Sequence, residues 1–127
     1  MSIGTLLYSH LSADAGISAL VGTRIYPVQM PQTPTLPAIS YGRISNTAQF
    51  GTTNVRETRY QVDCWAASYA SVQSVAMAVK AALEEWTDTD QTPAVKMAWV
   101  FSELDDYEAE TELYRVSIDI MCVTTGD

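Results

Sequence analysis

The sequence predicts one α+β domain, in which helices pack on one face of a mostly antiparallel four-stranded sheet. Three observations predict it. The chain has 127 residues, the length of one ordinary domain. Its residues are 47% hydrophobic and 17% charged, so it can bury a substantial core. Two pairs of strand-like segments flank one long helical pattern, and we expect residues 1–127 to fold as a single unit.

Two short helices are expected at the N-terminus. Apolar residues recur at helical spacing over residues 3–11, with Ser2 available as the N-cap. Asp14 can cap a second short helix, which Gly22 would end. Residues 24–27 then read as a short extended piece, and the prolines that follow exclude a helix.

The first hairpin is expected from residues 37–45 and 57–66. In the second segment the side chains are expected to alternate between two faces. One face carries Thr58, Tyr60, Val62 and Cys64, and the other carries Arg59, Gln61 and Asp63. This alternation is typical of a strand with one buried face. The polar stretch 46–54 between the segments is expected to be the hairpin loop, and its large apolar residue is Phe50.

The main helix and the second hairpin complete the prediction. The helix is expected to begin after Ser68 and to run to about Trp86, on a stripe of apolar residues: Val72, Val75, Ala76, Val79, Leu83 and Trp86. Strands are expected over residues 95–104 and 113–123, and the acidic residues 105–112 are expected to connect them.

The sheet face away from the helices is expected to be mixed. It would carry charged residues beside apolar ones: Arg59, Asp63, Arg115 and Asp119 beside Trp65, Met121 and Val123. Such a face is either buried against another subunit or simply exposes scattered apolar residues, and both interpretations stay open.

The composition excludes several function classes. The chain has 15 acidic and 7 basic residues, a formal charge of −8, which argues against nucleic acid or an anionic membrane as the main partner. No apolar run approaches the ~20 residues that span a bilayer, and the N-terminus lacks a signal-peptide pattern, so we expect a cytoplasmic location. Cys64 and Cys122 fit no zinc or redox spacing and are expected to be core residues.

No catalytic, cofactor-binding or metal-binding residue is predicted. His10 is the chain's one histidine, and no Gly-x-Ser-x-Gly motif exists to supply it with a nucleophile. The scattered glycines form no phosphate-binding loop, and the acidic run near residue 105 lacks the spacing of a calcium loop. The residues therefore indicate a non-enzymatic subunit of a larger assembly.

Four sequence blocks, in order along nearly the whole chain, point to a known family. They are ALVGTRIYP (residues 19–27), LPAISYGRIS (36–45), RYQVDCWAASYASVQSVAMAVKAALE (59–84) and LYRVSIDI (113–120). Together they resemble the tail-completion, or tail-terminator, proteins of long-tailed bacteriophages and prophages.

The resemblance implies a non-catalytic subunit without cofactors that closes into a homo-oligomeric ring, typically a hexamer. Such a ring would sit on the head-proximal end of the tail tube, stop tube polymerisation and offer a docking surface for the head. The implied partners are the tail-tube protein and the head–tail connector or neck protein. DNA would only pass through the ring, and no membrane is involved. The implied location is the virion tail, with the host cytoplasm during assembly.

A ring needs two different complementary patches on each subunit. We expect one patch to be basic, with Arg43, Arg56 and Arg59. The other is expected in the acidic stretch, with Glu103, Asp105, Asp106 and Glu108. The candidate interface also includes Phe50 of the hairpin loop. An interface of this kind would be sensitive to salt.

Two alternatives stay open from the sequence. The first keeps the protein in virion assembly, as a neck or head-completion component or a minor tail-tube subunit, because fold alone does not separate these roles. The second is a small cytoplasmic enzyme or ligand-binding domain, whose pocket Trp65, Trp86 and Trp99 would line.

Overall fold

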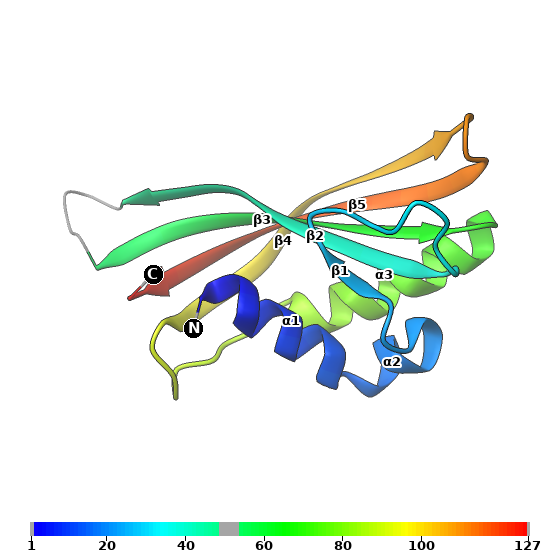
Figure 1. Cartoon of the computed structure of the whole chain (residues 1–127). Helices are drawn as coiled ribbons and strands as arrows, with labels where there is room; N and C mark the ends of the chain where they lie inside the picture. The colour runs from blue at the N-terminus through cyan, green and yellow to red at the C-terminus, as the bar shows by residue number, and fades with distance from the viewer. Residues whose placement is uncertain (1, 49–53, 127) are drawn as a thin grey trace.

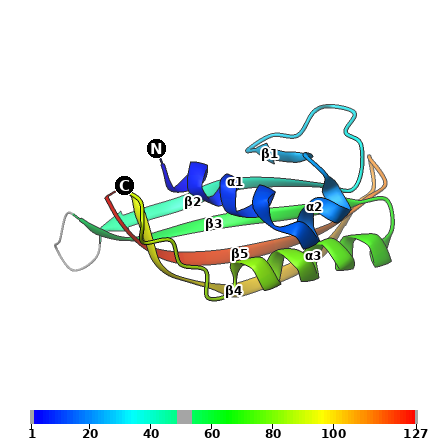
Figure 2. The same ribbon diagram turned by 90° about the horizontal axis from the view of Figure 1, so that it is seen from below.

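The helices all lie on one side of the sheet (Figures 1 and 2). The structure is a computed structural model that describes residues 2–48 and 54–126. Within these residues the helices are α1 (Ile3–Ala13), α2 (Ala15–Val21) and α3 (Tyr69–Leu83). The predicted arrangement of helices on one face is confirmed.

The sheet has five strands rather than the expected four. They are β1 (Ile25–Pro27), β2 (Ala38–Ala48), β3 (Val55–Ala66), β4 (Ala94–Glu108) and β5 (Leu113–Thr125). Their order across the sheet is β1-β2-β3-β5-β4, and every pairing is antiparallel except that of β1 with β2. The α+β class is confirmed, and the short extended piece expected from the sequence is an additional parallel strand at one edge.

The predicted N-caps are confirmed at all three helices. The side chains of Ser2, Asp14 and Ser68 each accept a hydrogen bond from the backbone N–H three residues later, at 3.2, 3.0 and 3.2 Å. Each cap satisfies an N–H group that has no partner inside its own helix.

Helix α3 ends at Leu83, three residues before the expected end at Trp86. The chain turns there because Glu85 has a left-handed backbone, with φ at 61°. Trp86 is still buried, and the His10 ring stacks on it at 4.8 Å between centroids. The His10 Nε2 atom lies 2.6 Å from the Ala82 carbonyl oxygen, so the histidine has a packing role between α1 and the end of α3.

The core lies between the helices and the inward face of the central strands. The residues expected to face inward include Tyr114 of β5, which is partly buried. The others expected on the inward faces of β3 and β5 are buried: Thr58, Tyr60, Val62, Cys64, Val116, Ile118, Ile120 and Cys122. The buried stripe of α3 and the apolar residues of α1 and α2 pack against them. This face therefore contributes most of the hydrophobic stabilisation of the domain.

The prediction of an acidic connection over residues 105–112 is wrong for residues 105–108. Strand β4 continues to Glu108, which pairs with Leu113 of β5. The hairpin end projects away from the helices (Figure 1), so a strand there can be charged on both faces. At the other hairpin, β2 extends to Ala48, which pairs with Arg56, and Phe50 lies outside the described residues.

Two bulges in β4 decide which of its side chains face the core. The register shifts between Val95 and Met97 and again between Val100 and Ser102. A bulge inserts one extra residue and so changes the face to which the following side chains point. As a result Ala98 is buried on the core side, while the larger neighbouring side chains lie on the open face.

Candidate assembly surface

The middle of the open face is polar, and its side chains are paired with one another. Arg59 and Asp119 form an ion pair with 2.8 Å between nitrogen and oxygen. Ser117 donates a hydrogen bond of 2.6 Å to the Asp63 carboxylate, and the Gln61 amide donates one of 3.0 Å. Both carboxylates of this band therefore accept hydrogen bonds from side chains of the same chain.

Apolar side chains gather on the open face beside the edge strand β4. We call this set the β4-edge patch; it consists of Met97, Trp99, Phe101, Met121 and Val123. Met97 is 54% exposed and Phe101 43% exposed. The Arg59 guanidinium lies 4.9 Å from the centre of the Phe101 ring, so the patch adjoins the polar band. Exposed apolar side chains at this density are typical of an interaction surface.

A second pair of exposed apolar residues lies at the opposite edge. We call it the β2-edge ridge; it consists of Val28 and Ile44, which are 84% and 51% exposed. Val28 has φ at 63°, in the left-handed region that β-branched residues rarely adopt. Its N–H donates a hydrogen bond of 2.6 Å to the Tyr41 carbonyl, which holds it against β2. With Gly42 and Gln61 the ridge borders a shallow depression of about 260 Å³.

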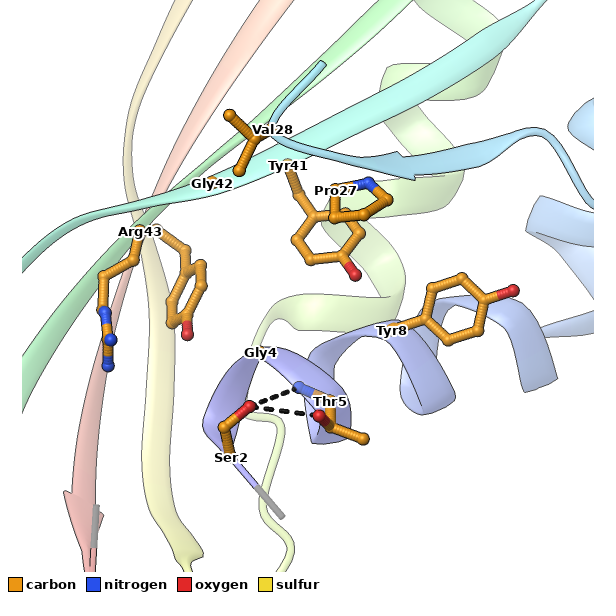
Figure 3. A pocket seen from close by; sticks show the side chains of 10 residues that line it. Ser2, Gly4, Thr5, Tyr8, Pro27, Val28, Tyr41, Gly42 and Arg43 are labelled. Atoms are coloured by element: carbon orange, nitrogen blue, oxygen red, sulfur yellow. Dashed lines mark hydrogen bonds between the residues drawn. The ribbon is translucent and has the colours of Figure 1, made fainter. Parts of the chain in front are cut away.

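A cavity of about 450 Å³ lies between the start of α1 and the β1–β2 edge (Figure 3). Its lining is rich in hydroxyl groups and aromatic rings: Ser2, Gly4, Thr5, Tyr8, Pro27, Val28, Tyr41, Gly42, Arg43 and Tyr60. Burial raises the pKa of Tyr41 above its ordinary value, so that hydroxyl is neutral at physiological pH. None of the described lining residues is a carboxylate, histidine or cysteine, which leaves the cavity without a candidate general base.

Another cavity, of about 480 Å³, lies between the proline-rich segment and the tip of the second hairpin. Its apolar lining comes from both sides: Met30, Pro31, Pro34 and Leu36 from the segment, with Trp65 and Leu113 from the sheet. Glu108 is at its rim. The Arg115 guanidinium lies 5.4 Å from the centre of the Trp65 ring, so this tryptophan contacts a cation on the open face.

The three arginines of the expected basic patch do not lie on one face. Arg43 pairs with Tyr60, whose ring points into the core, so Arg43 is on the helix side of the sheet. Arg56 is also on the helix side, two residues before the buried Thr58. Arg59 is on the open face with Asp119. Strand alternation thus separates Arg59 from the other two.

The acidic residues are divided in the same way. Glu103 and Asp105 are on the helix side, where α3 contacts both of them. Lys80 forms an ion pair with Glu103 at 3.0 Å, and the Tyr69 hydroxyl donates a hydrogen bond of 2.8 Å to Asp105. That hydrogen bond raises the pKa of Tyr69 above its ordinary value. These two carboxylates therefore hold β4 against the helix.

Asp106 and Glu108 lie on the open face of β4. Asp106 pairs with Arg115 of β5, with 2.7 Å between nitrogen and oxygen. Glu108 is exposed at the end of the strand, at the rim of the 480 Å³ cavity that Leu113 also lines. The acidic set is therefore two pairs of carboxylates that face in opposite directions.

The two thiols are buried and free, as expected. Burial raises the pKa of Cys122 to about 12 and that of Cys64 further still, so neither is a thiolate nucleophile at neutral pH. Among residues 2–48 and 54–126, no group of three or more His, Cys, Asp or Glu side chains is placed to hold a metal ion. No helix in those residues is both long and apolar enough to cross a membrane.

Sequence reasoning did not single out the β2-edge ridge or Met97. Ile44 lies at the irregular position between Arg43 and Ser45, where the pairing register shifts, and local alternation does not reveal such a shift. The alternation of large residues at 97, 99 and 101 was visible, but the bulges of β4 decide which face they occupy.

Comparison with known proteins now identifies the family. A model of the tail completion protein gp17 family matches residues 5–125. The chain belongs to this family. It is a structural protein of phage tail completion and not an enzyme, which confirms the expectation drawn from the resemblance. A comparison with curated proteins finds no match.

A solved structure has the same fold. It comes from the virion of a native gene transfer agent particle, and its chain is 21% identical to this one. The match covers 94% of this chain and 92% of that chain, with a TM-score of 0.78. The architecture described above is therefore shared by a component of a phage-like particle.

Proposed function

We propose that this tail completion protein forms a ring, most simply a hexamer, on the head-proximal end of the tail tube. The ring stops polymerisation of the tube and provides the docking surface for the neck of the filled head. The observation that carries the proposal is the family match over residues 5–125. The partners are then the tail-tube protein and the head–tail connector, and the protein becomes part of the virion tail.

The shape of the domain supports a ring. Ring closure requires a heterologous interface, in which two different surfaces of each subunit meet. The domain has two different exposed apolar sets, the β2-edge ridge and the β4-edge patch, at opposite edges of one sheet. Six copies would carry a formal charge of about −48, so DNA would be repelled rather than bound as it passes.

Charged residues belong to the proposed interface as well, in a narrower role than the sequence suggested. Lys80, Tyr69 and Arg115 of the same chain contact three of the four candidate carboxylates. Among the described residues, Glu108 is the candidate carboxylate that these contacts leave for a neighbouring subunit, and Arg56 is a candidate cation at the other hairpin. The two lie on opposite faces and at opposite ends of the sheet, so we expect each to tune a separate contact rather than to provide most of the free energy of association.

Imaging of assembly products tests the proposed function. The purified full chain is mixed with the tail-tube protein and viewed by negative-stain electron microscopy, with tube protein alone as the control. We expect a ring at one end of each tube and tubes of limited length. Particles made without the protein should have over-long tails and unattached heads. Tails of normal length without heads would contradict the terminator role and favour a neck component.

A further inference from the structure

The two exposed apolar edges lie at the same height along the strands. Ile44 immediately precedes Ser45, which pairs with Arg59 of β3. Arg59 pairs with Met121 of β5, and Met121 pairs with Trp99 of β4. Ile44 is therefore level with Trp99 across the full width of the sheet. Val28 is held at the Tyr41 carbonyl and is level with the Phe101 end of the β4-edge patch, because the pairing runs from Gly42 through Gln61 and Asp119 to Ser102. A sideways shift of one copy by one sheet width would bring the two edges together.

Both edges lack carboxylates in this acidic chain. Residues 38–48 contain one charged side chain, Arg43, and residues 94–102 contain one, Lys96. The chain as a whole has 15 acidic residues. Contact between these edges would bury apolar surface. The carboxylates of the adjoining polar band, Asp63 and Asp119, already accept hydrogen bonds from Ser117 and Arg59 of their own chain, which lowers the cost of covering them.

Val28 is the clearest sign that the ridge meets a partner. A β-branched side chain at φ of 63° is strained, yet it is 84% exposed and so gains little from packing in its own fold. Its side chain points away from α1 and Tyr8 (Figure 3). The isolated subunit therefore does not explain why a strained valine, rather than glycine, stands at this position.

The contact uses side chains rather than pairing of edge strands. The Glu85 N–H donates to the Ala98 carbonyl at 3.1 Å, and Asp88 forms a bridge with Val95. The segment that follows α3 therefore already covers this part of the backbone edge of β4. The side chains of the β4-edge patch, on the open face, remain accessible beside it.

We propose that Val28 and Ile44 of one copy pack against Trp99 and Phe101 of a second copy. The contact is heterologous, because the two apolar sets lie at opposite edges and cannot meet within one chain. Repeated around an axis, it joins each subunit to the next. This inference rests on the proposed ring and names the surfaces that build it.

Substitution of Val28→Gly separates assembly from folding. Glycine relieves the strain at φ of 63°, so the melting temperature of the subunit should rise while self-association weakens about tenfold or more. Glu112→Gly is the matched control, because Glu112 also has a positive φ, of 57°, and lies in the turn at the far hairpin. It should raise the melting temperature and leave self-association unchanged. Differential scanning fluorimetry and sedimentation velocity measure the two effects on the full chain.

A charge exchange tests which residues meet. Val28→Asp should abolish ring formation on tail tubes, and Phe101→Lys should weaken it, because each leaves a charge against apolar surface. The double variant should associate at least tenfold more tightly than Val28→Asp alone. Val28 is 84% exposed and Phe101 is 43% exposed, so the variants are expected to fold.

The outcomes separate the two proposals. If wild-type rings form on the tubes while Val28→Gly and Val28→Asp assemble as wild type does, this contact is overturned and the terminator function stands. The same holds if the double variant fails to recover. If the wild-type chain forms no ring with tube protein, the ring fails first, and the contact fails with it.

Discussion

The two faces of the central strands differ although they alternate residue by residue along the same chain. On the helix side, Tyr60, Val62 and Cys64 of β3 are buried in one continuous core. On the open side, Arg59, Gln61 and Asp63 of the same strand form a polar band between two apolar edges. The helix side therefore stabilises the subunit, whereas the open side is free to serve contacts between subunits.

The largest loss of stability is expected from a truncation in the helix-side core. Ile118→Ala should lower the free energy of unfolding by about 2–5 kcal/mol, because Ile118 is fully buried and its loss leaves a cavity. Met121→Ala, three residues along the same strand on the open face, should cost less than about 1 kcal/mol. Urea unfolding of the two variants measures the difference. Equal losses would contradict the division of roles between the faces.

Much of the fold was predictable because its signals are local. Ser2, Asp14 and Ser68 precede apolar residues at helical spacing, and each is a helix cap in the structure. The alternation of β3 placed its buried residues correctly. The parallel pairing of β1 was not predictable in this way, because it joins two segments through a long proline-rich connection. The strand character of residues 105–108 was hidden by their charge.

The grouping of the candidate interface residues was not predictable in this way, for a physical reason. Charges that are close in sequence within a strand point to opposite faces, as Asp105 and Asp106 do. The prediction treated them as one loop, where this alternation does not apply. Ile44 and Met97 depend on shifts in pairing register, which are set by contacts with other strands.

The ion pair of the polar band is expected to contribute less to stability than the core does. Asp119→Asn keeps the shape of the side chain but removes the charge opposite Arg59, whose Nε atom is buried and whose Nη2 atom makes the ion pair. We expect a loss of about 1–2 kcal/mol of stability, below that of Ile118→Ala. Urea unfolding at low and high salt checks it. The wild type should weaken with added salt more than the variant; equal salt dependence would show that the ion pair contributes little.

A smaller effect is expected from the polar pair within the helix-side face. The Thr58 and Thr124 hydroxyls lie 3.1 Å apart and are fully buried. Thr58→Val should cost about 1 kcal/mol, because it leaves the Thr124 hydroxyl without this partner. Changing both residues to valine should restore part of the loss, because no hydroxyl is then left without its partner at position 124. The hydrogen bond of 3.3 Å that Thr58 donates to the Asn46 amide oxygen stays lost in both variants. A double-mutant cycle in urea measures the coupling, and additive losses would argue against a shared hydrogen bond.

The smallest effect appears only at alkaline pH and comes from the helix-side thiols. The pKa of Cys122 is raised by burial from 9.0 to about 12, so the folded state keeps the neutral thiol while the unfolded chain ionises. The resulting stability is fully present below pH 9 and is lost as the pH rises toward 12. At pH 9.5 the loss from Cys122 should be about 0.8 kcal/mol. Cys122→Val removes this component. The wild type should therefore lose stability relative to the variant between pH 8 and pH 10.5, as measured by urea unfolding. A constant difference would mean that water reaches this thiol in the folded protein, contrary to a sealed helix-side core.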